Sequence, residues 1–154
     1  MILVVAEQRD GTLNRASLET IAAAQSTGDA IAIAVLGSGL DAVAQQLAKA
    51  AAGGVIAVDD PALKDYTADG FVMALEQLFA AETPDRVFLP HTYQTRDFAP
   101  ALAARVKRPL VTDCIAIKDG AYVRPMFQGK LQADIAVQGP VSYTHLTLPT
   151  ILRV

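Results

Sequence analysis

Short runs of apolar residues alternate with longer amphipathic stretches along most of the chain. The first four runs read as buried strands, because aliphatic and β-branched residues follow one another with little polar interruption. We predict these strands at residues 2–6, 30–36, 55–58 and 87–89. Strands that alternate with helices are typical of a mainly parallel sheet that helices cover on both faces.

The stretches after the first two strands have the spacing of helices. Asn14 can cap a first helix, in which Leu18, Ile21 and Ala22 form an apolar stripe. A second helix is predicted over residues 40–50, directly after the second strand and its glycines. Each of these helices can therefore pack on the sheet through one face.

Two further helices follow the third and fourth strands. Thr67 can cap the third helix, which carries a stripe that we assign to the core, formed by Phe71, Leu75, Leu78 and Phe79. The fourth helix is predicted over residues 98–106 and is ended by Pro109. Leu110 and Val111 open the next strand.

The alternation stops after Leu110, where residues 111–118, 121–125 and 131–137 read as strands without helices between them. Asp119-Gly120 predicts a two-residue hairpin turn, because a type I′ turn needs positive φ at both positions. The predicted fold class is therefore α/β, with three layers and a mainly parallel sheet flanked by helices in the manner of nucleotide-binding domains. The antiparallel strands near the C-terminus extend one edge of that sheet or form an arm that holds a partner.

Composition and charge narrow the class of protein. The 154 residues suffice for one domain with a core, and the net charge of −3 with scattered Lys and Arg argues against nucleic acid or anionic membrane as a partner. Cys114 is the one cysteine, so an internal disulfide is excluded and a buried strand residue is favoured over a reactive thiol.

The first residues lack the pattern of a signal peptide, and no apolar run approaches the roughly 20 residues that span a bilayer. We expect a cytoplasmic protein.

Residues 91–97 are the first place to look for chemistry, because loops after strands carry ligands in open α/β sheets. His91 could act as a base on Ser38 or Thr92, but no G-x-S-x-G elbow is present. A structural hydrogen bond is therefore the favoured role of His91. Arg96 can pair with a neighbouring acid or bind a ligand.

Carboxylates offer no clear site in the sequence. Asp97 and Asp113 can both lie near the carboxyl edge of the sheet, but Asp97 can equally favour the start of its helix. Asp59 and Asp60 precede Pro61 in a turn and are favoured as solvated loop residues over a metal site. No Cys/His cluster suits zinc. We therefore assign no catalytic, cofactor-binding or metal-binding residue.

Gly37-Ser38-Gly39 follows the second strand and precedes a helix, which is the layout of a phosphate site. The spacing matches neither G-x-G-x-x-G nor a P-loop, and no Lys follows the glycines. Asp41 in the first turn of the helix would also repel a phosphate. We therefore favour the interpretation that these glycines allow the chain to turn sharply.

Several segments, which follow one another in the family's order along the chain, resemble the amino-terminal domain of the electron transfer flavoprotein alpha subunit. H-T-x-x-x-R-D at residues 91–97 is followed by P-A-L-A-A-R at 100–105 and T-D-C at 112–114. V-R-P-M-F-Q-G-K at 123–130 resembles the family's Arg-Pro-x-x-x-Gly-Asn/Lys segment, and I-L-V-V-A-E at 2–7 also fits. Thr95 stands where the family has Gly and Ala101 where it often has Arg.

This resemblance implies an electron carrier, not an enzyme. The family forms heterodimers of alpha and beta subunits that carry electrons on FAD, from acyl-CoA and other dehydrogenases to a quinone oxidoreductase. The family's FAD lies mainly in the carboxyl-terminal domain of the alpha subunit, and AMP or a second FAD lies in the beta subunit. The resemblance does not cover that carboxyl-terminal domain, so we expect this chain to act as a scaffold and not to bind FAD alone. Arg96 and residues 124–130, from Arg124 to Lys130, are candidate subunit contacts.

The resemblance ends near residue 139 and divides the chain into two parts. Residues 1–139 are predicted to form the family's amino-terminal domain, and residues 140–154 an atypical tail on a truncated gene, poorly ordered or loosely packed. Burial of Tyr143 and Leu146 would count against this view of the tail. Two other functions stay open: a stress-type domain that binds AMP or ATP at residues 37–39, and a small hydrolase that uses His91.

Overall fold

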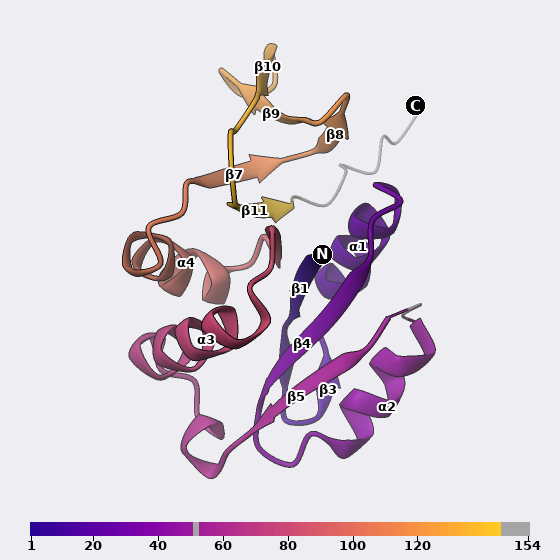
Figure 1. The fold of residues 1–154 in the computed structure, drawn as a ribbon, viewed down its shortest axis with the longest axis vertical. Helices are drawn as coiled ribbons and strands as arrows, with labels where there is room; N and C mark the ends of the chain where they lie inside the picture. The colour runs from indigo at the N-terminus through magenta and orange to yellow at the C-terminus, as the bar shows by residue number, and fades with distance from the viewer. Residues whose placement is uncertain (51–52, 146–154) are drawn as a thin grey trace.

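The computed structural model describes residues 1–50 and 53–145, which form an α/β fold in three layers (Figure 1). Within these residues a six-stranded parallel sheet forms the middle layer, in the order β5-β4-β1-β6-β11-β7. Its strands are β1 (Ile2–Ala6), β4 (Ile31–Gly37), β5 (Val55–Asp59), β6 (Arg86–Pro90), β7 (Leu110–Cys114) and β11 (Val141–His145). The sheet confirms the fold class that the alternating pattern predicts.

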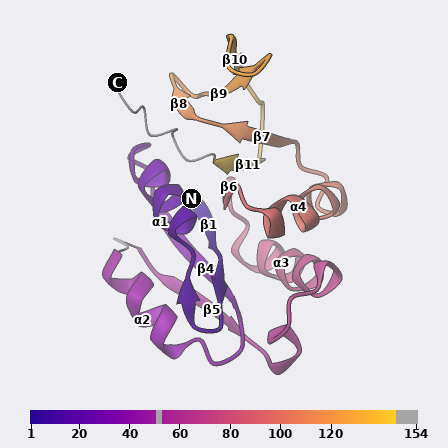
Figure 2. The same cartoon turned by 180° about the vertical axis from the view of Figure 1, so that it is seen from behind.

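Helices cover both faces of the sheet, as the two opposite views show (Figures 1 and 2). One face packs against α1 (Arg15–Gln25) and α2 (Asp41–Ala50). The other packs against α3 (Ala68–Glu82) and α4 (Tyr93–Arg105), with a 3-10 turn, η1 (Pro61–Leu63), before α3. The parallel sheet is thus covered on both sides, which explains its uninterrupted apolar strands.

Strand β1 shows how one apolar run supplies two cores. Ile2 and Val4 point to the face of α1 and α2, whereas Leu3 and Val5 point to the face of α3 and α4. All four side chains are buried. Successive strand residues alternate in direction, so a run that is apolar at every position can supply both cores from the middle of three layers.

Side-chain caps set the starts of three helices. The side chain of Asn14 accepts a hydrogen bond from the Ala16 amide at α1, and Thr67 accepts one from the Gly70 amide at α3. Both caps confirm the sequence prediction. Thr92 caps α4 in the same way, so this helix begins at Tyr93 and not near residue 98. Most of the polar stretch 91–97 is therefore the first turn of a helix and not a loop, which corrects the prediction.

The buried face of α1 also differs from the predicted stripe. Leu18 and Ala22 are exposed, although Ile21 is buried as expected. Ser17 and Thr20 are buried on this face instead, and their hydroxyls are hydrogen-bonded. Ser17 Oγ accepts a hydrogen bond from the Glu7 amide at 2.8 Å, and Thr20 Oγ1 donates one to the Ala16 carbonyl at 2.8 Å. Hydrogen-bonded hydroxyls can be buried at little cost, which apolar periodicity alone does not reveal.

The antiparallel strands form a separate sheet, which we call the arm (residues 116–135). In the described residues it has three strands in the order β10-β9-β8, namely β8 (Ala116–Lys118), β9 (Ala121–Met126) and β10 (Leu131–Ile135). The run predicted as one strand over 111–118 divides at Ile115 between the two sheets. Asp119 and Gly120 have φ values of 49° and 80°, which confirms the predicted hairpin turn.

The arm is anchored at its base and exposed at its far end (Figure 1). Tyr122 is buried, and Ile117 and Ile135 pack against the same core as α1 and α2. At the other end Met126, Phe127 and Leu131 are exposed. The chain thus forms an arm beside the sheet and does not extend its edge.

Residues 141–145 are not loosely packed, which corrects that part of the prediction. They form β11, which lies between β6 and β7 and pairs with both in parallel. Val141, Ser142 and Thr144 are buried. A gap between two parallel strands leaves backbone donors and acceptors on both sides, so an extended segment there is held by its backbone. The side chain of Tyr143 and residues 146–154, with Leu146, lie outside what the structure describes, and the foreign origin of residues 140–154 stays a prediction.

Candidate functional site

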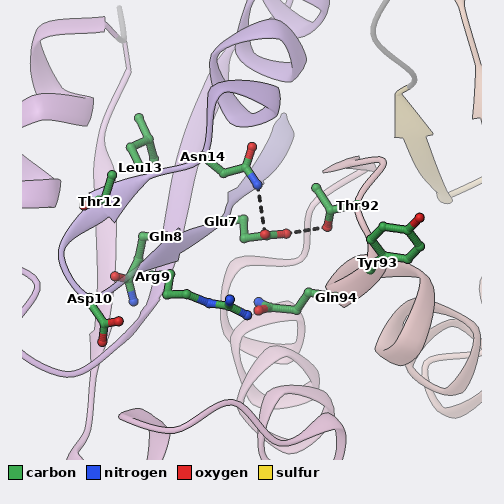
Figure 3. Close-up of a pocket in the computed structure, with 10 residues that line it drawn as sticks. All are labelled: Glu7, Gln8, Arg9, Asp10, Thr12, Leu13, Asn14, Thr92, Tyr93 and Gln94. Atoms are coloured by element: carbon green, nitrogen blue, oxygen red, sulfur yellow. Dashed lines mark hydrogen bonds between the residues drawn. The ribbon is translucent and has the colours of Figure 1, made fainter.

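The carboxyl edge of the parallel sheet carries a hollow at the point where the strand order reverses. The chain passes from β1 to β4 and β5 on one side, whereas β6 lies on the other side of β1. In open α/β sheets this switch point is where ligands usually bind. Here a hollow of about 730 Å³ lies between the end of β1 and the first turn of α4 (Figure 3). We call it the switch-point hollow.

The carboxylate of Glu7 links the two sides of this hollow (Figure 3). Its Oε1 accepts a hydrogen bond from Asn14 Nδ2 at 3.0 Å, and its Oε2 accepts one from the hydroxyl of Thr92. Asn14 and Thr92 are the caps of α1 and α4. The Glu7 side chain therefore joins the end of β1 to the starts of two helices, and both of its oxygens are in use.

A short hairpin covers the same edge next to Glu7. It consists of β2 (Gln8–Arg9) and β3 (Thr12–Leu13). Gln8 Nε2 donates to the Leu36 carbonyl at 3.1 Å and lies 2.4 Å from the position of a Cβ at Gly37. A side chain at Gly37 would therefore displace the end of the Gln8 side chain and its hydrogen bond to Leu36.

The glycine loop that resembled a phosphate site already holds an anion from the chain itself. Asp59, at the end of the neighbouring strand β5, accepts hydrogen bonds from the Gly39 amide at 3.0 Å and the Leu40 amide at 2.8 Å. These amides precede α2 and are the groups that a phosphate would use. Asp59 is thus a helix-capping residue and not a solvated loop acid, which corrects the prediction.

His91 lies in a polar cluster at the ends of β6, β7 and β11. Its Nε2 lies 3.1 Å from Oδ1 of Asp113, and its Nδ1 lies 3.2 Å from Oγ1 of Thr144. Arg124 NH2 of the arm reaches the other oxygen of Asp113 at 3.4 Å. The Asp113 carboxylate therefore joins the parallel sheet to the arm. Asp113 itself has a φ of 60°, a conformation that Asp tolerates better than most residues.

Burial lowers the pKa of His91, and the neighbouring charges oppose each other. Asp113 acts to raise this pKa, whereas the Arg96 guanidinium acts to lower it further. His91 is therefore neutral near pH 7, with Nε2–H donating to Asp113 and Nδ1 accepting from the Thr144 hydroxyl. This is the structural hydrogen-bonding role that the sequence favours.

The predicted partners of a catalytic His91 belong to other parts of the edge. Thr92 donates its hydroxyl to Glu7, and Ser38 lies in the loop between β4 and α2. In the described residues, no hydrogen bond joins His91 to either hydroxyl. A nucleophile within reach of a base is the arrangement that covalent catalysis needs, and His91 does not have it here.

The two candidate carboxylates also belong to different clusters. Asp97 accepts a hydrogen bond from the Tyr66 hydroxyl at 2.7 Å, whereas Asp113 binds His91 and Arg124. Burial, together with Asp97, raises the pKa of Tyr66, so this hydroxyl stays protonated and donates. Each carboxylate therefore has its own partners, and the two do not share one.

Other chemistry finds little support in residues 1–50 and 53–145. Cys114 is buried, and burial raises the pKa of its thiol to about 12, so it is a neutral core residue as predicted. In the same residues, no group of three His, Cys, Asp or Glu side chains is placed to hold a metal ion. None of the described helices is both long enough and apolar enough to cross a bilayer.

Sequence reasoning missed the positions of Glu7, Asp59 and Tyr93 at the edge of the sheet that carries the hollow. Each follows a strand end or a cap, so each lies at the carboxyl edge of the sheet. Asp59 could have been found from topology, since β5 ends beside β4 and its terminal acid meets the glycine loop. Tyr93 could have been found once Thr92 was read as the cap of α4.

The fold and its edge define an open, parallel α/β domain of the nucleotide-binding type whose switch point is crossed by its own side chains. Residues 2–142 match the family model described as the electron transfer flavoprotein domain. The chain belongs to the electron transfer flavoprotein family.

Curated relatives agree with this family. The chain is 36% identical to the electron transfer flavoprotein subunit alpha of Bacillus subtilis, over 94% of this chain and 46% of the relative. It is 31% identical to the subunit of the same name from Syntrophomonas wolfei, over 88% of this chain and 44% of the relative. It is also 32% identical to the acryloyl-CoA reductase electron transfer subunit beta of Anaerotignum propionicum, over 73% of this chain and 32% of the relative. The chain spans less than half the length of these relatives.

Proposed function

We propose that this chain is the amino-terminal scaffold of an electron transfer flavoprotein alpha subunit. The flavin site lies in the remainder of the protein, and this half holds the subunits together. The observation that carries the proposal is the family match over residues 2–142. Relatives named as alpha subunits are about twice as long, which leaves room for a second domain.

The carboxyl edge supports a scaffold over a nucleotide-binding domain. The amides of Gly39 and Leu40 are bonded to Asp59, and both oxygens of Glu7 are bonded to Asn14 and Thr92. A phosphate or ribose at this edge would have to displace bonds that stabilise the fold. We therefore expect that the chain does not bind FAD or AMP by itself.

The partner that suits this role is a second, beta-type subunit in the cytoplasm. The arm supports this, because its far end exposes the apolar side chains of Met126 and Phe127 and the basic Lys130, all within the candidate segment 124–130. Arg96 on α4 is the other candidate contact. Electrons then pass from acyl-CoA or other dehydrogenases to a quinone oxidoreductase through FAD in the assembled complex. A relative that is named as an electron transfer subunit of a CoA reductase fits this substrate class.

Ligand titration tests the scaffold proposal. The purified chain is titrated separately with FAD and with AMP while its thermal unfolding is measured, because a ligand that binds only the folded state raises stability by RT ln(1 + [L]/Kd). We expect no shift with either ligand. An AMP shift that Ser38→Pro abolishes would instead favour a nucleotide site at the glycine loop.

Subunit assembly tests the partner. The chain is mixed with its cognate beta-type subunit, and complex formation is followed by analytical ultracentrifugation. We expect Phe127→Asn to weaken assembly, since it removes an exposed ring while Asn tolerates the φ of 52° at this position. Met73→Asn, at an exposed position on α3, is the matched control. Unchanged assembly in the Phe127 variant would remove the arm from the interface.

A further inference from the structure

Two exposed side chains on the first turn of α4 stand between two hollows. Tyr93 is 89% exposed, and Arg96 follows it at the i+3 position on the same side of the helix. The guanidinium carbon of Arg96 lies 5.9 Å from the centre of the Tyr93 ring. A cation–π contact of this kind holds the two side chains together. We call this pair the Tyr93–Arg96 ridge.

One hollow lies on each side of the ridge. Tyr93 lines the switch-point hollow, whereas Arg96 lines a smaller cavity of about 230 Å³ beside His91. The smaller cavity has a buried wall of Thr95 and Ala99 and an apolar side formed by Pro100 and Leu110. Its polar end is formed by His91, Thr112, Asp113 and Thr144. Its volume lies below the about 300–1,000 Å³ of ordinary ligand pockets, so it suits a single side chain.

Among the described residues around this cavity, no carboxylate is paired with Arg96. Asp113 is the carboxylate that lines it, and both Asp113 oxygens face other groups, His91 and Arg124. In the described residues, no carboxylate forms a salt bridge with Arg96. Arg96 is nevertheless close enough to the cavity to lower the pKa of His91. The mouth of the cavity is therefore positive.

We propose that the ridge and the smaller cavity form a docking site for an acidic side chain, Asp or Glu, of the beta-type subunit. The incoming carboxylate pairs with the Arg96 guanidinium, which presents a fork of donors suited to it. Tyr93 packs against the partner around that pair. Tyr and Arg are the residues enriched among those that carry most of the energy of an interface. The inference rests on the proposed assembly with a beta-type subunit.

A neutral occupant suits the cavity less well. An apolar side chain would fill it but would cover the Arg96 guanidinium without offering an acceptor, and burying an unpaired charge is costly. A carboxylate fills the same space and balances the charge. Charge complementarity therefore selects an acidic partner side chain.

The test measures the affinity of the full chain for its cognate beta-type subunit by isothermal titration calorimetry at low and high salt. We expect Arg96→Gln and Tyr93→Ala each to weaken binding about tenfold or more. Arg15→Gln changes another exposed Arg in the first turn of a helix, α1, and should leave the affinity unchanged. Binding of Arg96→Gln should also depend less on salt, because the charge pair has been removed.

A second measurement reports on the cavity itself. The ring of His91 is titrated by NMR in the free chain and in the complex. A carboxylate beside Arg96 offsets the guanidinium charge and raises the pKa of His91, so we expect an upward shift on assembly. The shift should be absent with the Arg96→Gln chain. Both variants change exposed side chains, and their thermal unfolding shows whether the fold is kept.

The outcomes separate this inference from the proposed function. If the wild-type chain binds the beta-type subunit and the two variants bind equally well, the docking site is wrong and the scaffold role stands. If the wild-type chain does not bind at all, both are wrong. If Arg96→Gln weakens only self-association of the chain, the occupant is a second copy and the proposed partner is wrong.

Discussion

The parallel sheet and the arm differ in how far they bury their apolar side chains. Each strand of the sheet interior has layers on both faces, as Leu3 and Val4 of β1 show. The arm covers one face at its base, through Tyr122 and Ile135, and leaves its far end uncovered. Both regions use apolar side chains, but only the sheet buries nearly all of them.

This difference indicates where stability and where recognition reside. Burial of apolar surface is the main favourable term in folding, so the sheet contributes most of it. Apolar side chains that stay exposed on an anchored element instead mark a site of interaction. The following predictions test that division, starting from the largest expected effect.

Removing a core side chain should cost far more than removing an arm side chain of the same type. Leu75 on α3 is fully buried, and Leu75→Ala should lower the free energy of unfolding by about 2–5 kcal/mol. Leu131 in β10 is 59% exposed, and Leu131→Ala should change it by less than about 0.5 kcal/mol. Urea denaturation of both variants measures the difference. Equal losses would mean that the arm is part of the core.

The link made by Glu7 should be the next most costly to break. Glu7→Ala removes the acceptor of Asn14 Nδ2 and leaves the Thr92 hydroxyl only the longer contact to Thr95, so we expect a loss of about 1–3 kcal/mol in the free energy of unfolding. Glu7→Gln keeps one acceptor and should lose less. Equilibrium unfolding of the two variants compares them. If both variants have the same free energy of unfolding as the wild type, the hydrogen bonds of Glu7 contribute nothing to stability.

The cap made by Asp59 should contribute about 1 kcal/mol, the usual worth of a capping side chain. Asp59→Ala frees the amides of Gly39 and Leu40, whereas Asp59→Asn retains one acceptor. The loss should appear in the melting temperature of the Ala variant and be smaller in the Asn variant. An unchanged melting temperature in the Asp59→Ala variant would show that water replaces the carboxylate without loss of stability.

Acid should weaken the junction between sheet and arm through His91. Its pKa is lowered in the folded state, mainly by burial, so the unfolded chain takes up a proton first, near the ordinary value of about 6.5. The stabilisation that neutral His91 gives to the folded state is fully present above that pH and is lost as the pH falls below it. Unfolding midpoints of wild type and His91→Gln, compared at neutral pH and near pH 5, measure it. A wild type that gains stability relative to the variant on acidification would reverse the assigned direction.

The end of the arm should be the least sensitive part of the fold. Phe127 is 70% exposed, so Phe127→Asn should change the free energy of unfolding by less than about 0.5 kcal/mol. Self-association of the isolated chain, measured by light scattering, should fall as the apolar surface is reduced. A large loss of stability would place this ring in a packed site and would end the contrast between the regions.

Local sequence patterns predicted much of the fold. The caps Asn14 and Thr67 were readable because a short polar side chain before an apolar stripe has one helical role. The turn at Asp119 and Gly120 was readable because few residue pairs accept positive φ twice. These features depend on neighbours in the chain, so no knowledge of the tertiary structure is required.

The candidate site was much less predictable. Sequence reasoning found His91, Arg96 and Asp113 as individual residues, but their arrangement depends on which strands are neighbours. The chain leaves the parallel sheet after Cys114 and forms the arm, and strand β9 of the arm brings Arg124 next to Asp113. Such contacts join distant parts of the chain and have no local signal.

The sequence by itself determined the class of fold, the family and the exclusion of an internal disulfide, since Cys114 is the one cysteine. Each follows from periodicity, order of motifs or residue type, which are properties of the chain alone. Only the tertiary structure decided that Asp59 caps α2, that Glu7 crosses the switch point and that residues 141–145 enter the sheet. The physical reason is that a buried polar group must find a partner, and which partner is within reach depends on how the strands are ordered.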